Sequence, residues 1–587
     1  MEHEPVAVAD VPAAGPGGTT RPTTTQDRLQ VAALVLLGLS LAVGAVRAMQ
    51  FGWVPVGDEA LIEMRVRDVP GHLPLLGVYS RFGWSHPGPA QFVLLALPYR
   101  LLGSVSAALL AGALTGHLMA VAVGWWIARR IDRLAGALVL VAFEAVLICV
   151  PSGLVRSAWN PYVALLGAGL MVVIAWGWAE RIGVAAVLLL PLATLLVQSH
   201  VGNLPLVAMV VLASTPLALS WRTDVDAEPE SRPVPWRAVG AGAVVAVVLW
   251  IPALVEQLMG EPGNVTKMVQ DLSNDTPRVG VVDALGVTTG FFGWRPAWTD
   301  QNSLTQQIAG TAWVVPVWLA LPVVALVVAL RRRDAPMVRG LLISGVGVAS
   351  TVVAAAEVKG VFFSYLIVGH RSTVVVCMAI SVVALLRALP VSARSLVTTA
   401  LAGPAVVLAL TIGLLQWSAP NPSGPFDLTV RAVTSAVAEQ ADGSAVFITS
   451  TGDDPARDVA SGLLLQLERA GIDATTVRDE DWRTGSHRTG DGVPDGALDV
   501  RIAPVGSERQ LAEEGYRVLV EYQPFSADEV AAIDALVTER KALIRQGDSD
   551  PGSELDSAIR FVRIQGLADQ IAALSDGRVS TQVGVRD

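Results

Sequence analysis

Two adjacent carboxylates, Asp58 and Glu59, follow the first long apolar run of this chain of 587 residues. The chain is 52% hydrophobic with a mean hydropathy of +0.52, which indicates an integral membrane protein. A carboxylate at the exit of a membrane span is costly unless it meets water, a cation or a substrate. An aspartate can also simply cap a helix. The position of the pair makes both residues the first candidates for catalysis, and charged residues follow at helical spacing: Glu63, Arg65, Arg67 and Asp68.

Arginine and histidine side chains recur in the turns that join the apolar runs. Arg81 and His86 precede a Pro-Gly-Pro turn, which gives the next helix a rigid start. Each residue alone is more typical of a helix cap or of an interfacial side chain that reaches toward water. Together they would place cations beside the carboxylates, which suits a phosphate held at the lipid interface. The candidate substrate-binding residues are therefore Arg65, Arg81, His86, Arg156, His200, His370 and Arg371.

Apolar runs of about 18 to 22 residues recur up to residue 417, and each is long enough to cross a hydrocarbon core. The segment 89–103 is shorter, because its helix would reach about 22 Å against a core of about 30 Å. It could be re-entrant, interfacial or a short tilted span. We therefore expect a polytopic α-helical protein with about 11 to 13 transmembrane helices over residues 31–417. The clear spans are predicted near 31–49, 105–127, 134–151, 160–178, 183–199, 203–220, 238–256, 311–330, 339–356, 366–388 and 396–416.

The distribution of basic residues predicts the orientation of these spans. If the N-terminus is cytoplasmic and 89–103 does not span, 15 basic residues fall in short cytoplasmic segments and 11 in longer external ones. This agrees with the positive-inside rule, whereas a spanning 89–103 would invert the parity. We therefore predict external loops at 50–88 and 257–310. A Pro/Gly/Thr-rich, disordered cytoplasmic tail is predicted at 1–30.

Residues 418–587 differ in composition from the rest of the chain. Residues 421–587 hold 29 acidic and 16 basic residues, whereas the remainder holds 23 acidic and 26 basic residues. A net charge of −13 in this part argues against nucleic acid as a partner, because nucleic-acid binding needs a cationic surface. Alternating strand-like and helix-like segments predict a soluble α/β domain on the extracytoplasmic side. Strands are expected at 445–449, 474–477 and 517–522, and helices at 427–441, 455–470 and 526–545.

The order of the motifs resembles that of a known family. The acidic pair is followed by HPGPAQFVLLALPYRLLG, which starts at His86, and then by a span that ends in IARRIDR. This order resembles the polyprenyl-phosphate-sugar-dependent glycosyltransferases of the GT-C fold, over about residues 30–260. The group includes protein mannosyltransferases, aminoarabinose transferases and actinobacterial arabinofuranosyltransferases. The resemblance implies that Asp58 is the catalytic base and that Glu59 supports it or contacts a metal ion.

The resemblance also implies the partners of the protein. They are a polyprenyl-phosphate sugar donor, a glycan or lipid acceptor, and the lipids of the plasma membrane. No nucleotide site is needed, because the lipid phosphate is itself the leaving group. An inverting transfer needs a carboxylate base and cations that stabilise the departing phosphate. The sequence assigns no cofactor, although a divalent cation could bind at Asp58 and Glu59.

Two other classes of protein share this composition. One is a transporter or flippase of lipid-linked glycans, and the other is a non-catalytic membrane protein of envelope assembly. Transporters place charged groups near the middle of the membrane and often show repeated halves. Here Glu144 is the exception among largely uncharged spans, and no repeat is evident. The pattern therefore favours the glycosyltransferase.

Overall fold

The protein is described by a computed structural model. The described residues are 25–50, 52–220, 233–300, 314–360, 362–419, 426–451, 454–549 and 578–586, together with separate residues between 560 and 574. Residues 1–24 of the predicted tail, residues 301–310 of the predicted loop, the start of the predicted span 311–330 and the linker at 420–425 lie outside the described residues. The tail was predicted to be disordered up to residue 30, but residues 25–30 already belong to helix α1 (Thr25–Gln50), where Asp27 pairs with Arg129.

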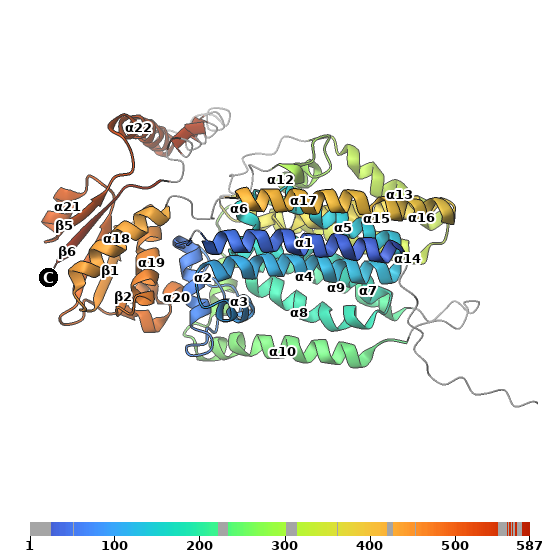
Figure 1. Ribbon diagram of the computed structural model, residues 1–587, viewed down its shortest axis with the longest axis horizontal. Helices are drawn as coiled ribbons and strands as arrows, with labels where there is room; N and C mark the ends of the chain where they lie inside the picture. The colour runs from blue at the N-terminus through green and yellow to red at the C-terminus, as the bar shows by residue number, and fades with distance from the viewer. Residues whose placement is uncertain are drawn as a thin grey trace, which may run out of the picture.

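Long helices lie side by side in a bundle (Figure 1). Helix α7 is apolar on all sides and is almost wholly buried, which is typical of a helix in the interior of a bundle. Eight described helical segments are long and apolar enough to cross a membrane. They are Thr25–Gln50 (α1), Ala107–Ile131 (α4), Asn160–Ala179 (α7), Val201–Leu219 (η1 and α9), Trp236–Met259 (α10), Ala335–Ala356 (α14), Ser364–Leu386 (η4 and α15) and Val391–Ser418 (α16 and α17).

Three further predicted spans coincide with shorter apolar helices. These are α5 (Arg133–Ile148), α8 (Gly183–Ser199) and α13 (Ala320–Arg331), which a 3-10 turn at Val317–Leu319 precedes. At 1.5 Å per residue, the 17 residues of α8 reach about 26 Å, somewhat less than a full hydrocarbon core. Each of the eleven predicted spans thus corresponds to a helical segment of the described chain. The prediction of a polytopic α-helical membrane protein is confirmed.

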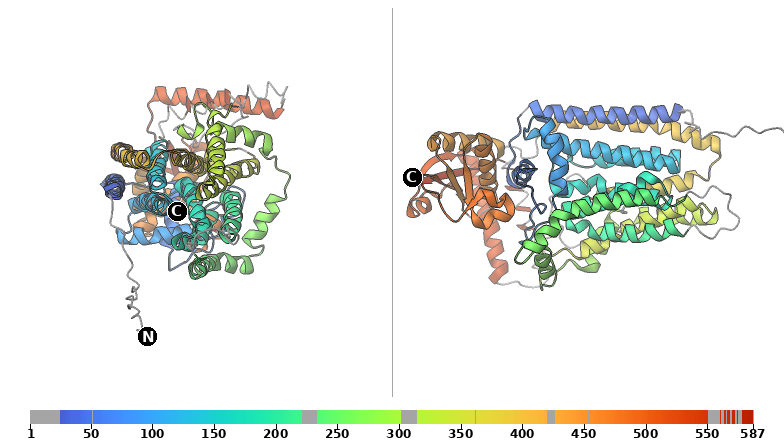
Figure 2. Two further views of the ribbon diagram at one scale, coloured as in Figure 1. Left: turned by 90° about the vertical axis from the view of Figure 1, so that its right-hand side faces the viewer. Right: turned by 90° about the horizontal axis from the view of Figure 1, so that it is seen from below.

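The two helices that follow α1 do not run with the bundle. Helix α2 (Gly57–Arg67) and helix α3 (Ala90–Leu101) both lie across one end of it, roughly perpendicular to the long helices (Figures 1 and 2). Helix α3 has 12 residues and reaches about 18 Å, so it is too short to cross a membrane. The doubtful segment 89–103 therefore lies at the end of the bundle.

The two ends of the bundle differ: the C-terminal domain covers one end, and basic turns lie at the other. Helix α1 runs toward α2, and helix α17 (Ala402–Ser418) runs toward the C-terminal domain, so both lead to the same end (Figure 1). Basic turns gather at the opposite end, where ion pairs join the helices. Arg387 lies 2.7 Å from both Asp132 and Asp334. Arg339 lies 2.7 Å from Glu180.

The C-terminal domain contains a six-stranded sheet in the order β3-β2-β1-β4-β6-β5. The pairs β3–β2, β2–β1 and β1–β4 are parallel, whereas β6 is antiparallel to both β4 and β5. The strands are Val446–Ser450 (β1), Ala474–Val477 (β2), Thr489–Gly490 (β3), Leu498–Ala503 (β4), Arg517–Tyr522 (β5) and Thr581–Arg586 (β6). The helices are Phe426–Ala441 (α18), Asp454–Arg469 (α19), Asp481–Thr484 (α20), Glu508–Glu513 (α21) and Ala527–Ser549 (α22). The predicted α/β domain is confirmed.

Helix α2 belongs to two hydrophobic cores at once. Ala60, Leu61 and Met64 pack with Val433 and Leu463 in the core of the C-terminal domain. Ile62 and Val66, on another side of α2, pack with residues of α3 and α4 such as Phe92, Tyr99 and Leu109. Each large apolar side chain buried in this way contributes about 1.5 to 3 kcal/mol. The helix that carries the acidic pair therefore packs between the membrane bundle and the C-terminal domain.

Candidate active site

The acidic pair lies in the first turn of α2. Gly57 starts this helix with φ of +53°, a backbone conformation that favours glycine, and its Cα faces Asp458 of α19. A Cβ at this position would lie 2.6 Å from Oδ1 of Asp458. Carboxylates in a first turn interact favourably with the positive end of the helix dipole. The chain therefore enters α2 in a fixed direction, which determines where Asp58 and Glu59 point.

Both oxygens of Asp58 accept hydrogen bonds. The hydroxyl of Tyr79 donates to Oδ1, and the indole Nε1 of Trp159 donates to Oδ2 at 2.7 Å. The hydroxyl of Ser157 donates to Oε1 of Glu59 at 2.6 Å. Burial and the neighbouring charge of Asp58 raise the pKa of Tyr79 far above its ordinary value, so the phenol stays a donor. Asp58 is thus fixed in one orientation by neutral donors.

A cavity of about 690 Å³ opens beside this pair. Its membrane-domain wall carries Asp58, Glu59, Tyr79 and Arg81, and the aromatic rings of Trp159 and Tyr162 complete that wall. Tyr365 lies behind Trp159, with ring centres 4.7 Å apart. The other wall belongs to the C-terminal domain and consists of Arg457, Asp458, Asp479, Glu480 and Arg483. A volume of this size accommodates a small organic ligand.

Arg81 is the one predicted cation that lines the cavity. Its Nη2 donates to the carbonyl oxygen of Lys359 at 3.3 Å, and its guanidinium lies 5.3 Å from the ring centre of Phe363. These contacts keep a positive charge on the same wall as Asp58. The cavity therefore combines a held carboxylate, a cation and aromatic rings.

The two predicted histidines nearest to the pair form a buried couple away from the cavity lining. The rings of His86 and His200 lie 4.7 Å apart, and Nδ1 of His86 accepts a hydrogen bond from the backbone of Val201 at 3.2 Å. Burial and the neighbouring His200 lower the pKa of His86 well below its usual value, and burial lowers the pKa of His200 to about 4. Both rings are neutral at physiological pH, so neither supplies positive charge to a phosphate.

The remaining predicted binding residues also lie outside this cavity lining. Nδ1 of His370 lies 2.9 Å from the hydroxyl of Thr351, and Arg65 pairs with Asp68 at 3.5 Å. Arg156 donates to the side chain and backbone of Gln416 at 3.2 and 2.5 Å. Arg371 donates to the backbone oxygens of Trp298 and Asp300 at 3.3 and 2.9 Å. The structure thus brings together Asp58, Glu59 and Arg81, and engages the other candidates in structural contacts.

The residues that sequence reasoning did not assign to the site come from two places. Ser157 and Trp159 follow Arg156 in the turn before α7, and Tyr162 lies in the first turn of that helix. The sequence marked this turn, but through Arg156, which does not line the cavity. The five residues of the C-terminal wall lie about 400 positions after Asp58. No local pattern in the sequence connects them with α2.

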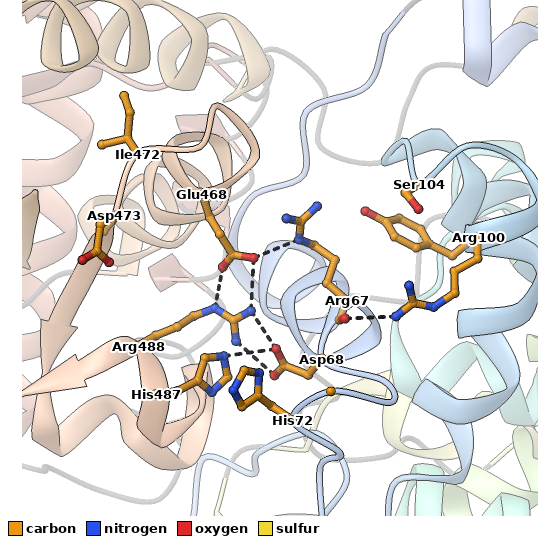
Figure 3. A pocket seen from close by; sticks show the side chains of 13 residues that line it. Arg67, Asp68, His72, Arg100, Ser104, Glu468, Ile472, Asp473, His487 and Arg488 are labelled. Carbon is orange, nitrogen blue, oxygen red and sulfur yellow. Dashed lines mark hydrogen bonds and ion pairs between the residues drawn. The ribbon is translucent and has the colours of Figure 1, made fainter. Parts of the chain in front are cut away.

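A second, smaller cavity of about 410 Å³ lies on the same domain boundary, and Figure 3 shows the charged residues that line it. Arg488 donates to Asp68 at 2.8 and 3.0 Å and to Glu468 at 2.6 Å, and Arg67 donates to Glu468 at 3.0 Å. Nearby, Arg469 of α19 lies 2.5 Å from the buried carboxylate of Glu63. These pairs hold α2 against the C-terminal domain.

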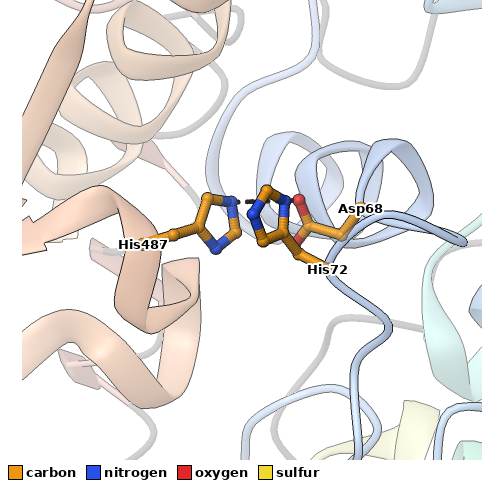
Figure 4. Close-up of side chains that lie close together, drawn as sticks. All are labelled: Asp68, His72 and His487. Carbon is orange, nitrogen blue, oxygen red and sulfur yellow. Dashed lines mark ion pairs between the residues drawn. The ribbon is translucent and has the colours of Figure 1, made fainter.

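Asp68, His72 and His487 form a cluster of potential metal ligands at this boundary (Figure 4). The two imidazole rings stack with centres 4.2 Å apart, and Nε2 of His487 lies 3.2 Å from Asp68. Both carboxylate oxygens of Asp68 already accept from the guanidinium of Arg488. A cation here would compete with that guanidinium, so the cluster is better described as part of the ion-pair network.

Comparison with solved structures identifies the architecture. The chain is similar to ArnT from Cupriavidus metallidurans, both in the crystal structure bound to undecaprenyl phosphate and in the apo state, with TM-scores of 0.51 and 0.50 at 13% sequence identity. The match covers 84% of this chain and 95% and 96% of the ArnT chains. The chain up to Ser418, where the bundle ends, makes up less than 84% of its length, so the match extends into the C-terminal domain. No protein-family model and no curated protein matches the sequence. The fold is that of the GT-C membrane glycosyltransferases.

Proposed function

We propose that the protein is a membrane glycosyltransferase that transfers a sugar from a polyprenyl-phosphate-linked donor to a hydroxyl group of a cell-envelope acceptor. The observation that carries this proposal is the fixed orientation of Asp58 in a cavity at the end of a GT-C bundle. The undecaprenyl phosphate in the ArnT structure supports the class of donor. The fold supports the class of reaction.

In the proposed reaction, Asp58 is the general base. The acceptor hydroxyl oxygen attacks the anomeric carbon while the bond from that carbon to the phosphate oxygen breaks. Asp58 takes the hydroxyl proton, and the electron pair of the broken bond leaves with the polyprenyl phosphate. A single displacement of this kind inverts the anomeric centre. A positioned base of this type contributes about 10²- to 10⁴-fold to the rate.

Other residues of the cavity orient the reactants. Arg81 lies on the wall that carries Asp58, where its guanidinium would neutralise charge on the departing phosphate. Tyr79 and Trp159 each donate to one oxygen of Asp58, and the remaining lone pairs of the carboxylate can accept the proton of the acceptor hydroxyl. Glu59 supports the turn through Ser157.

We also propose that the site faces the outside of the plasma membrane. The basic turns Arg129–Arg130 and Arg331–Arg333 lie at the far end of the bundle from the C-terminal domain, as the helix directions require. The positive-inside rule assigns that far end to the cytoplasm. The C-terminal domain would then be extracytoplasmic, at the surface where envelope acceptors are assembled.

A divalent cation at Asp58 and Glu59 remains part of the proposal only as an accessory. Carboxylate oxygens are suitable ligands for Mg²⁺ or Mn²⁺. The cation would share the oxygens of Asp58 with the hydrogen bonds from Tyr79 and Trp159. The base chemistry of Asp58 requires no metal.

The test replaces Asp58 with asparagine. We expect Asp58→Asn to lower sugar transfer at least 100-fold, because the amide keeps the shape but accepts no proton. Undecaprenyl phosphate should still raise the melting temperature of the variant, because Asp58 is not the phosphate ligand. Asp442→Asn, at an exposed turn of the C-terminal domain, is the matched control. Full transfer activity in Asp58→Asn would remove Asp58 as the base.

One observation favours a transporter as the alternative. Glu144 on α5 is fully buried within the bundle, and neither of its carboxyl oxygens has a hydrogen-bond partner among the described residues. Intramembrane carboxyls of this kind occur in proton relays. A transporter would move a lipid-linked sugar across vesicles without forming a glycosidic bond, and Glu144→Gln would stop that movement. If the protein is a transferase, the Glu144→Gln variant in vesicles should still transfer sugar to the acceptor.

A further inference from the structure

We propose that the C-terminal domain forms the acceptor subsite and that the acceptor is the end of a saccharide chain. This inference rests on the proposed transferase activity and extends it to the substrate class. Of the fifteen residues that line the cavity beside Asp58, five belong to this domain: Arg457, Asp458, Asp479, Glu480 and Arg483. The cavity is therefore completed by the soluble domain.

The chemistry of the two walls differs. The C-terminal wall places carboxylates and guanidinium groups side by side, with Arg483 lying 2.7 Å from Glu480. Such a wall can accept from and donate to the hydroxyl groups of one ligand. A phosphate would select cations alone, and a lipid chain would select apolar side chains. The opposite wall supplies the rings of Trp159 and Tyr162, which can pack against the C–H face of a sugar ring.

The position of this wall relative to the base is fixed. The guanidinium of Arg483 lies 4.6 Å from the ring centre of Tyr79, whose hydroxyl donates to Asp58. Gly462 of α19 approaches the carbonyl oxygen of Pro55, where a Cβ would lie at 3.2 Å. A ligand held on the C-terminal wall is consequently aligned with the carboxylate. Such alignment is what a bimolecular transfer requires of its second substrate.

The location of the cavity separates the two substrates. The membrane bundle lies on one side of α2 and the C-terminal domain on the other (Figure 1). A polyprenyl chain has to stay with the bundle and its lipid. The saccharide chain end then approaches from the side of the soluble domain, where its hydroxyl groups stay hydrated until they bind.

The experiment uses the full-length protein in nanodiscs and the double variant Arg457→Ala/Asp479→Ala. Both side chains are exposed, so the variant should fold, and its net charge is unchanged. The control is Glu439→Ala/Arg509→Ala, which makes the same change of charge at exposed positions outside the cavity lining. Binding of soluble mannose- and arabinose-terminated trisaccharides is measured by saturation-transfer NMR, together with acceptor KM and kcat.

We expect the double variant to weaken trisaccharide binding at least tenfold and to raise the acceptor KM by the same factor. The control Glu439→Ala/Arg509→Ala should keep the trisaccharide binding, the acceptor KM and the kcat of wild type. A glycolipid acceptor in the same nanodiscs should show the same loss, because the saccharide end is shared. Equal trisaccharide binding in both double variants would overturn the inference, as would transfer to a serine- or threonine-containing peptide in preference to the saccharides.

The readouts keep the inference separate from the proposed function. Trisaccharide binding is measured without donor and needs no turnover. If wild type and Asp58→Asn transferred sugar equally, the assignment of the base would fail while the binding result still decided the subsite. If binding were unaffected by the double variant but Asp58→Asn were inactive, the subsite alone would be wrong.

Discussion

The guanidinium of Arg483 lies 4.6 Å from the ring centre of Tyr79. The two residues belong to different domains and are separated by about 400 positions in the sequence. Tyr79 donates its hydroxyl hydrogen to Asp58, so this stacking contact links the C-terminal domain to the proposed base. The C-terminal domain thereby contributes to the proposed site, and substitutions at Tyr79 and at Arg483 both test the contact.

Tyr79→Phe should lower kcat about 10- to 100-fold. The change removes a hydrogen bond to a charged group, which is worth about 1.5 to 3 kcal/mol, and leaves Trp159 as the remaining donor to Asp58. Tyr516→Phe is the matched control, because its hydroxyl also donates to an aspartate, Asp499, at 3.0 Å. Steady-state transfer by the two variants decides the matter, and equal rates would show that Tyr79 does not position the carboxylate.

Arg483→Lys and Arg483→Met should both lower kcat, by about 2- to 30-fold. Lysine keeps the charge but loses the planar group that stacks on Tyr79, and a cation–π contact is worth about 0.5 to 2 kcal/mol. Arg478→Met, at an exposed position outside the cavity lining, should have no such effect. Rescue by lysine, with only the acceptor KM changed in the methionine variant, would show that Arg483 acts by charge on the substrate.

Asp68→Ala or Arg488→Ala should lower the free energy of unfolding by about 1.5 to 3 kcal/mol, because each removes a buried hydrogen-bonded ion pair between the domains. The loss is limited because Glu468 still pairs with Arg488, and His487 still lies beside Asp68. Burial alone would raise the pKa of Asp68, but hydrogen bonds from His487 and Arg488 outweigh it and hold that pKa below its usual 3.8. The pair therefore stabilises the protein at neutral pH, and this contribution is lost in acid as the pH falls through the lowered pKa.

A double-mutant cycle on Asp68 and Arg488, followed by thermal unfolding and hydrogen exchange, measures that coupling. The exposed pair Arg478 and Asp491 serves as the comparison and should give about 1 kcal/mol or less. A coupling energy near zero for Asp68 and Arg488 would contradict their role in holding the two domains together.

His200→Asn should reduce the loss of stability between pH 6.5 and about pH 4. The buried ring has a pKa of about 4 in the folded protein, so only the unfolded chain takes up a proton in this window. The contribution of His200 to the free energy of unfolding is fully present above pH 6.5. Below that pH it falls by up to about 1.4 kcal/mol per pH unit.

Asparagine keeps an acceptor for the backbone N–H of Gly202 and cannot titrate. Melting temperatures of wild type and His200→Asn between pH 7.5 and 4.5 provide the measurement. The donor KM at pH 7.5 should be unchanged, because a neutral ring outside the cavity lining does not bind phosphate. If the melting temperatures of the two proteins fell equally with pH, the lowered pKa of His200 would be disproved.

Most of the fold could be predicted because its signals are local. The spans are long apolar runs, and the predicted 183–199 coincides with α8. In the C-terminal domain, the predicted strand 474–477 is β2 and 517–522 is β5, whereas 445–449 is displaced by one residue from β1. Strands β4 and β6 were not predicted. They pair with each other although about 80 positions separate them in the sequence, and neither is an apolar run of its own.

The site was only partly predictable for a physical reason. The sequence marks polar residues in turns, but it does not tell whether such a residue faces a cavity or satisfies a buried carbonyl. Asp58, Glu59 and Arg81 face the cavity, whereas Arg156 donates to Gln416 in the interior. In the sequence, all of them lie in polar segments between apolar runs.

The amino-acid sequence was sufficient to predict the membrane bundle and the α/β character of the C-terminal domain, and it singled out the Asp58–Glu59 turn as a candidate site. These follow from the length of apolar runs, from periodicity and from the cost of a charge near lipid. The side chains that meet that turn became evident from the three-dimensional arrangement of the helices. The docking of α19 on α2 brings Arg483 and its neighbours to Asp58, and it depends on packing between surfaces about 400 positions apart. No local pattern encodes such a contact.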